Sequence, residues 1–282
     1  MQLGMAGLAG CRTAVKQSST VLRAGPFAVT VPVDWSRDAI IAKIPINPLH
    51  TPENWKLYQE NEQYALKPGY SCRPGHWAIR LPAALPGGVP RSGEDPGDDP
   101  TAPQILIHKA DEWRLTLTDG KHEESTVAET LRALREKMET AMDHEDPHLS
   151  PGYMDASMEF TCLKRRIGFT GGHGIRMVTQ WTIEPDLMIS GRLHYLFLGM
   201  SDDDSCQIIA TFPLNLPGLP TEEKRSHLGR STANYQDFSN TYDQYTSDAK
   251  KWLEQNAGNI TPSLQTLDQM LESLVVRRWE QS

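Results

Sequence analysis

Glycine-rich runs can bind phosphate when a helix begins directly after them. This chain has a glycine-rich run in its second half. Gly171-Gly172-His173-Gly174 lies between two apolar segments. A P-loop ends in Gly-Lys-Ser or Gly-Lys-Thr and leads into the free N–H groups of a helix. Residues 175–183 instead have the pattern of a strand. We therefore expect residues 168–174 to form the connection of a β-hairpin.

Histidine and acidic side chains are the other groups that could hold a metal ion or move protons. His173 and His194 fall in the strand-rich second half, and His144 and His148 flank the acidic pair of a proline-containing loop. A zinc site needs three or four converging ligands. His173 and His194 have no short ligand spacing, and His144-Glu145-Asp146-Pro147-His148 lies in a proline-containing loop and lacks the helical geometry of the H-E-x-x-H zinc motif. The G-x-S-x-G elbow of a serine hydrolase is also missing from the sequence. We expect no catalytic residue, no metal ion and no cofactor.

A cysteine near the start of the sequence could carry a lipid. Leu8-Ala9-Gly10-Cys11 closes a short apolar run that begins at Leu3, and this pattern resembles the lipobox of bacterial lipoproteins. The resemblance implies cleavage before Cys11, attachment of a diacylglycerol to its thiol, and export to the cell envelope, at a membrane in the periplasm or on the outer surface. A secretory signal also has a basic segment before its apolar run. None precedes Leu3, so either the true start lies upstream of Met1 or the match is accidental.

The other three cysteines allow at most one disulfide bond within the chain. Cys162 and Cys206 both lie in strand-like segments, whereas Cys72 lies in a stretch rich in proline and glycine. Disulfide bonds persist in exported proteins, and Cys162–Cys206 is the pair we expect if one forms. Buried free thiols are the competing interpretation.

Length and charge limit the classes of protein that this sequence can represent. Its 282 residues are 38% hydrophobic and 23% charged, which suits one large globular domain or two small ones. The formal net charge of −8 argues against a nucleic-acid partner, because neutralising phosphates requires a basic surface. The basic cluster Lys164-Arg165-Arg166 is too short to change that, and we expect it at a solvated strand edge or in a hairpin arm. A transmembrane helix needs about 18 consecutive apolar residues, and no later stretch is that long.

Two kinds of apolar periodicity predict an α+β fold. Apolar and polar residues alternate in 27–33, 77–81 and 113–117, as expected for half-buried strands. The other predicted strands are the apolar segments 104–109, 158–167, 175–183, 193–200 and 206–212. Helical spacing covers 126–142 and 239–276, and Thr261 is the expected N-cap of the last helix. Because consecutive strands are joined by short turns, we expect an antiparallel β-sheet covered by helices.

Composition also suggests where the folded part begins and ends. We expect a truncated signal and polar tether at 1–25, a single domain at 26–276, and a tail at 277–282. Residues 82–103 are rich in proline, glycine and aspartate. Such a segment buries too little apolar surface to offset the entropy of ordering it, so we expect a mobile insertion.

Several motifs resemble the PsbP-like superfamily, to which many bacterial lipoproteins are similar. Phe27-x-Val29-x-Val31-Pro32-x-x-Trp35 is similar to its F-x-V-x-x-P-x-x-W opening, and residues 261–274 resemble its closing helix. The resemblance implies a PsbP-like α+β sandwich, and it carries over no shared catalytic residue.

These features predict a non-enzymatic, exported and lipid-anchored interaction or assembly module. Its expected partners are a membrane surface, reached through a lipid on Cys11, and a protein of unknown identity, with no nucleic acid. The alternative is a small-ligand-binding protein, or an enzyme whose pocket is not visible in the sequence.

Overall fold

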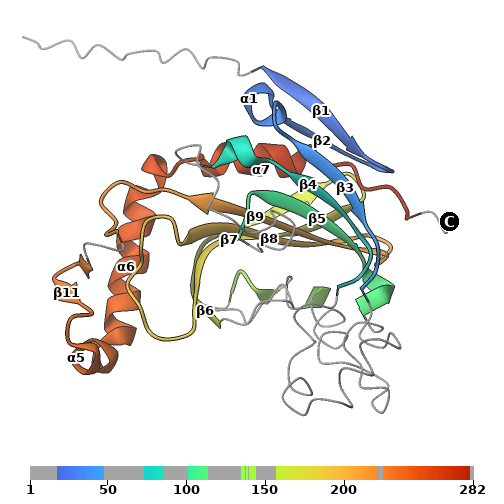
Figure 1. Ribbon diagram of the computed structural model, residues 1–282. Helices are drawn as coiled ribbons and strands as arrows, with labels where there is room; N and C mark the ends of the chain where they lie inside the picture. The colour runs from blue at the N-terminus through green and yellow to red at the C-terminus, as the bar shows by residue number, and fades with distance from the viewer. Residues whose placement is uncertain are drawn as a thin grey trace, which may run out of the picture.

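A seven-stranded antiparallel sheet forms the centre of the molecule (Figure 1). The structure is a computed structural model that describes residues 18–47, 73–85, 101–113, 135–136, 138, 140–143, 157–221 and 225–279. The strands of the sheet are β3 (Ile40–Ile44), β4 (His76–Arg80), β5 (Gln104–Lys109), β6 (Ser157–Phe169), β7 (Gly172–Thr182), β8 (Leu193–Ser201) and β9 (Cys206–Leu214). Their order is β3-β4-β5-β9-β8-β7-β6, so two meanders meet where β5 pairs with β9. The expected antiparallel sheet and the α+β class are confirmed.

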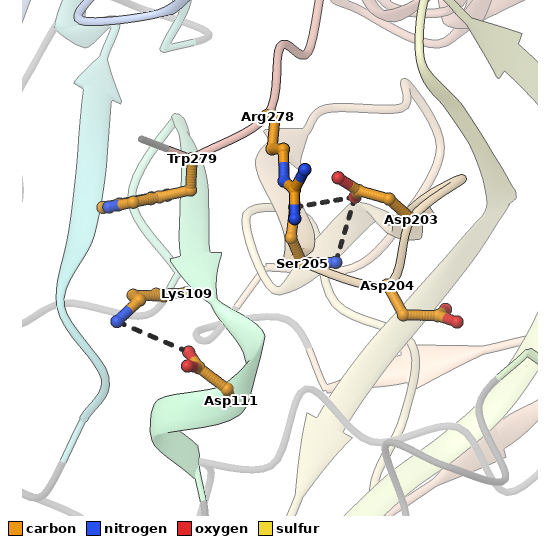
Figure 2. A pocket seen from close by; sticks show the side chains of 7 residues that line it. All are labelled: Lys109, Asp111, Asp203, Asp204, Ser205, Arg278 and Trp279. Atoms are coloured by element: carbon orange, nitrogen blue, oxygen red, sulfur yellow. Dashed lines mark hydrogen bonds and ion pairs between the residues drawn. The ribbon is translucent and has the colours of Figure 1, made fainter. Parts of the chain in front are cut away.

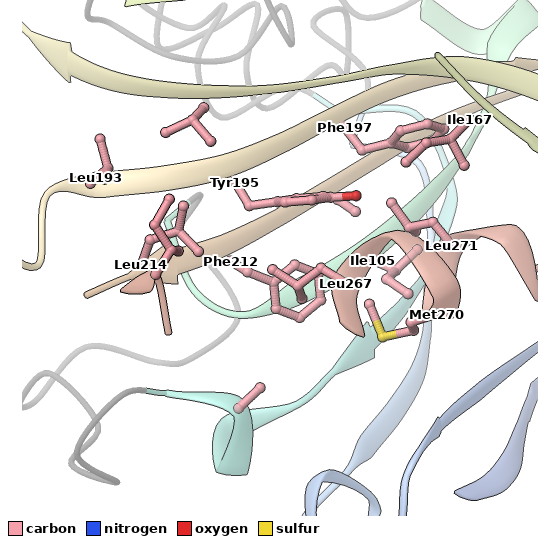
Figure 3. Close-up of a cluster of buried hydrophobic side chains, with 14 of the residues drawn as sticks. Ile105, Ile167, Leu193, Tyr195, Phe197, Phe212, Leu214, Leu267, Met270 and Leu271 are labelled. Carbon is pink, nitrogen blue, oxygen red and sulfur yellow. The ribbon is translucent and has the colours of Figure 1, made fainter. Parts of the chain in front are cut away.

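One face of the sheet is covered by a hairpin and two helices. The hairpin is formed by β1 (Ser19–Ala24) and β2 (Phe27–Pro32), and the helices are α6 (Tyr242–Asn256) and α7 (Leu264–Glu272). Figure 3 shows the apolar side chains of α7, Leu267, Met270 and Leu271, facing Tyr195 and Phe197 of β8. All of these residues are buried. Burial of this apolar surface is the main force that holds the layers together.

The opposite face of the sheet carries a second, smaller core. Leu196 and Leu198 of β8 point to this face, because successive side chains of a strand alternate between the two faces. They pack in one cluster with Trp113, Met138 and Ala141. Every residue of β8 is buried, which explains why its sequence shows an almost continuous apolar run instead of a clean alternation.

The remaining elements are short. They are α1 (Val33–Ser36), η3 (Pro82–Ala84), η4 (Ala110–Glu112), β10 (Ser226–His227), β11 (Arg230–Ser231), α5 (Tyr235–Asn240) and η5 (Ala257–Asn259). Of the helix predicted at 126–142, residues 135, 136, 138 and 140 are helical and 126–134 lie outside the described residues. None of the described helices is both long and apolar enough to cross a bilayer.

The glycine-rich run forms a tighter hairpin than predicted. Phe169 pairs with Gly172, so only Thr170 and Gly171 connect β6 to β7. Gly174 lies within β7 beneath the ring of Phe197, and a Cβ atom there would come 2.5 Å from that ring. The predicted connection at 168–174 is therefore too long, because three of its glycines and Phe169 belong to the strands. At Gly172 and Gly174 the missing side chain makes room for an aromatic ring.

The folded part also extends beyond the predicted boundaries. Strand β1 begins at Ser19, inside the segment expected to be a tether. Trp279 packs against Phe27 with ring centroids 5.5 Å apart, inside the segment expected to be a tail. The backbone of Leu81 donates to Pro103 at 2.9 Å, which closes the base of the expected insertion, whereas residues 86–100 lie outside the described part.

The segment after α7 joins parts of the chain that are far apart in sequence. Ala28 of β2 exchanges two backbone hydrogen bonds with Val275, at 3.1 and 2.8 Å. On the other side of the same segment, Thr170 accepts from Val276 and donates to Leu274. The hairpin β1–β2 and the β6–β7 turn are thus held by one short length of backbone.

Candidate functional site

A cavity of about 580 Å³ opens at one end of the sheet. It lies where β5 ends, where the turn joins β8 to β9, and where the chain continues beyond α7 (Figure 2). The lining residues are Lys109, Asp111, Asp203, Asp204, Ser205, Arg278 and Trp279. Its volume is within the range of small-molecule sites, about 300–1,000 Å³, and most of its polar groups are held in place by neighbouring residues.

The Asp203 carboxylate is fixed by the turn that contains it. Its Oδ1 accepts hydrogen bonds from the hydroxyls of Ser201 and Ser205, each at 2.7 Å, and from the backbone N–H of Ser205 at 3.1 Å. These bonds, with the Ser205 hydroxyl as the largest contributor, hold the pKa of Asp203 below its usual value. None of these three hydrogen bonds uses Oδ2, which can therefore accept from a ligand.

Asp204 is neutralised by an arginine from the segment between β5 and β6. The Arg135 guanidinium donates to Asp204 Oδ1 at 2.6 and 3.0 Å, and also to the carbonyl of Ser201 at 2.6 Å. Asp204 has a φ of 57°, in the left-handed region that the tight turn requires. Arg135 therefore fixes the turn between β8 and β9 from outside the sheet.

Lys109 is held on the opposite wall by two acidic side chains. Its Nζ lies 3.1 Å from Glu112 Oε1 and 3.7 Å from Asp111 Oδ1. The hydrogen bond to Glu112 is the main reason that the pKa of Lys109 is raised. Glu112 in turn accepts from the backbone N–H of Gly75 at 2.7 Å. The lysine is therefore a fixed cation tied to the end of the sheet.

Arg278 and Trp279 close the cavity from the segment after α7. Trp279 packs against Phe27, so the apolar wall of the cavity is supported by the β1–β2 hairpin. Within the described part of the chain, the Arg278 guanidinium has no hydrogen-bond or ion-pair partner. The lining carries two cations and three carboxylates, a formal net charge of −1.

A second polar cluster lies in the core rather than at the surface. Asp268 of α7 is 2% exposed and accepts from Arg176 at 3.0 and 2.9 Å, from Arg165 at 2.7 Å and from the Tyr195 hydroxyl at 3.0 Å. Burial alone would raise the pKa of Asp268, but the arginine hydrogen bonds outweigh it and lower the pKa. All of its partners come from the sheet, so this cluster anchors α7. Arg165 lies on the edge strand β6, as expected, and its half-exposed side chain also reaches this cluster.

The structure does not bring together the site residues predicted from sequence. Cys162 and Cys206 are free, buried thiols on β6 and β9, with β7 and β8 between them. Three strand spacings of about 4.8 Å exceed the Cα separation of about 4.4–6.8 Å that a disulfide bond allows. The expected pairing is therefore wrong and the competing interpretation, free thiols, describes the structure. Burial raises the pKa of Cys206 to about 11.

The predicted histidines are also not brought together in the described part of the chain. His173 pairs with Met200 and His194 with Thr179, at opposite ends of the β7–β8 ladder. Cys11, His144 and His148 lie outside the described residues. Within the part that the structure describes, no three His, Cys, Asp or Glu side chains gather as a metal site would require.

The cavity has no local signal in the sequence, because its lining residues are spread from Lys109 to Trp279. The strands predicted at 193–200 and 206–212 leave residues 201–205 only as a connection between them, and residues 278 and 279 fall in the expected tail. The nearest signal was a basic-aromatic pair, Arg278-Trp279, directly after a predicted buried helix.

Comparisons with known proteins gave no match. No family model, no curated protein and no solved structure matches this chain.

Proposed function

We propose that this protein is a binding module of the bacterial cell envelope that holds a small ligand in the cavity at the end of its sheet. The observation that supports this is the way the lining charges are fixed. Asp203 and Asp204 are each held by hydrogen bonds from within the protein, and Lys109 is held by Glu112. Polar groups held in place before a ligand arrives lose little freedom on binding, which favours affinity.

The same charges are better suited to binding than to catalysis. A general acid or base works best with a pKa near the working pH. Here the hydrogen bonds from Ser205 lower the pKa of Asp203, and the hydrogen bond to Glu112 raises the pKa of Lys109. Both groups are therefore held in their charged forms at neutral pH and act as fixed charges.

The proposed location rests on the sequence. The Leu8-Ala9-Gly10-Cys11 motif supports a lipid on Cys11 and a protein held at a membrane surface. The PsbP-like resemblance supports a PsbP-like sandwich as the finer description of the α+β fold. Incorporation of labelled palmitate in a producing bacterium tests the anchor. Label that disappears in Cys11→Ala supports it, and no label in the unaltered chain removes it.

Thermal unfolding of the full chain against a broad library of small molecules tests the binding function. A ligand at 100 times its Kd adds about 2.7 kcal/mol to stability. A genuine ligand of the cavity loses its effect in Arg278→Gln and keeps it in Arg277→Gln, a matched control at an exposed arginine that does not line the cavity. If every hit stabilises both variants equally, the cavity is not the binding site. A hit that the protein converts into a product would instead favour the enzyme alternative.

An open sheet edge favours a second candidate, the interaction or assembly module. Strand β3 ends the sheet, pairing only with β4 among the described strands, and its Ile40 and Ile41 are 43% and 38% exposed. Such an edge can accept an extended segment of a partner protein. Ile41→Lys should abolish capture of that partner from membranes. Val21→Lys, at an exposed apolar residue of β1, should leave it unchanged, and equal loss in both variants would argue against the edge.

A further inference from the structure

Two complementary charges in the cavity have no counterpart within the described protein. The Arg278 guanidinium is unpaired, and Asp203 uses only Oδ1 for its three internal hydrogen bonds. A guanidinium matches the two oxygens of a carboxylate or phosphate, and a carboxylate oxygen accepts from an ammonium group. The cavity thus offers one site for an anion and one for a cation.

The other lining charges already have partners. Lys109 lies between Glu112 and Asp111, and Asp204 is bonded to Arg135. Counting these partners, the site holds three cations and four carboxylates, a formal net charge of −1. A ligand that carries only negative charge is therefore repelled, whereas one with a balancing ammonium group is not.

Trp279 supplies an apolar wall beside these charges. Its indole lines the cavity and is backed by Phe27. An indole face binds flat apolar groups, and it also attracts ammonium groups through its π-electrons. The three features together describe one kind of ligand.

We propose that the cavity binds a small zwitterion, with an ammonium group directed to Asp203, an acidic group directed to Arg278, and an apolar part against Trp279. This inference rests on the proposed binding function and specifies its ligand class. Free amino acids with an apolar side chain have all three features, and the phosphoethanolamine headgroup of lipids has the two charges.

Isothermal titration calorimetry on the full chain tests the charge requirement with three molecules of one shape. Phenylalanine carries both charges, phenethylamine carries only the ammonium, and phenylpropionate carries only the carboxylate. Each charged hydrogen bond is worth about 1.5–3 kcal/mol, so phenylalanine should bind about tenfold or more tighter than either analogue. Glycerophosphoethanolamine is titrated in parallel. Tighter binding of this compound than of phenylalanine identifies a lipid headgroup as the ligand, and tighter binding of phenylalanine identifies an amino acid.

Two variants connect each charge to its residue. In Arg278→Gln, phenylalanine should lose its advantage over phenethylamine. In Asp203→Asn, which keeps an oxygen for the serine hydrogen bonds, phenylalanine should lose its advantage over phenylpropionate. Arg277→Gln is the matched control and should change none of the affinities, and the melting temperature of each variant shows that it is folded.

The outcomes separate this inference from the proposed function. An analogue with one charge that binds as tightly as the best zwitterion overturns the inference. If no zwitterion binds, but a library hit binds and depends on Arg278, the ligand class is wrong and the binding function stands. If neither the zwitterions nor any library hit depends on Arg278, both proposals fail.

Discussion

Asp268 and Arg176 face each other beneath α7 and are joined by two hydrogen bonds, at 3.0 and 2.9 Å. Both side chains are buried, and 92 residues separate them in the sequence. A buried ion pair contributes little net stability compared with an apolar pair, but removing one partner leaves an uncompensated charge in the core. This relationship makes the position of α7 on the sheet sensitive to a single carboxylate.

Asp268→Asn should lower the free energy of unfolding by about 3 kcal/mol or more, because the buried Arg176 loses its counter-charge. Urea denaturation measures the effect. Glu272→Gln is the matched control, since Glu272 bonds the same Arg165 at 2.9 Å but is 40% exposed; it should cost less than about 1 kcal/mol. Equal losses in the two variants would contradict a structural role for the buried pair.

The stabilisation from Asp268 should disappear in acid. The pKa of Asp268 is lowered in the folded protein, so its contribution is complete above the unfolded value of about 3.9 and is lost as pH falls through the folded pKa. The difference in unfolding free energy between the unaltered chain and Asp268→Asn should therefore shrink below about pH 4. A difference that stays constant from neutral pH into that range would show that the charge of Asp268 is not its source.

Stability should also fall as His227 is protonated. His227 is buried against Trp252, and its Nδ1 lies 2.9 Å from the Tyr245 hydroxyl, which accepts from the Met188 N–H. Desolvation lowers the pKa of His227. The contribution of neutral His227 to stability is therefore complete above about pH 6.5 and is lost as pH falls below that value.

Thermal unfolding between about pH 7.5 and 5.5 checks this prediction on either side of the ordinary histidine pKa. His227→Phe should be less stable at neutral pH but show a flatter dependence on pH. Tyr245→Phe removes the same hydrogen bond while leaving the histidine, so it should keep more of the pH dependence. An unchanged slope in His227→Phe would assign the effect to His76 and His108, whose pKa values burial also lowers.

Gly174→Ala should destabilise the fold by about 2 kcal/mol, the usual cost of overpacking a core. The new Cβ would lie 2.3 Å from the backbone oxygen of Leu198 and 2.5 Å from the Phe197 ring. Gly168→Ala in the adjoining strand is the control, because nothing lies within 4 Å of the equivalent position. Chemical denaturation of both variants gives the comparison, and equal stability would show that the ring moves aside without cost.

The two described thiols should resist alkylation in the folded protein. Cys162 and Cys206 are buried, and the raised pKa of Cys206 keeps it as the unreactive thiol at neutral pH. Peptide mapping after iodoacetamide treatment should find both unmodified under native conditions and both modified in denaturant without reductant. A Cys162–Cys206 peptide that appears only after reduction would contradict the structure.

Local patterns were enough to predict most of the sheet. Alternation located β2 and β4, and short turns between apolar runs led to the antiparallel arrangement of β6 to β9. The sequence does not predict strand β1 (STVLRA), because only one face of this strand packs against the core. Leu22 and Ala24 lie on that face. Such a mixed pattern resembles a polar linker until its partner strand is known.

Contacts between distant residues account for what the sequence could not show. Thr261 was the expected N-cap of the last helix, but Asn215 bonds its backbone and Ser263 caps α7 through its side chain. Arg165 reaches Asp268 across 103 positions, and the cavity combines residues from Lys109 to Trp279. Neither partner in such a pair carries a local signal of the other.

The backbone pairing of Ala28 with Val275 sets a limit on when this molecule can assemble. During synthesis, the first hairpin emerges from the ribosome long before the segment that secures it to the rest of the sheet. The hairpin lacks that support until residue 275 has been translated. A stop codon between α7 and Val275 would therefore remove the backbone partner of a hairpin that was made much earlier.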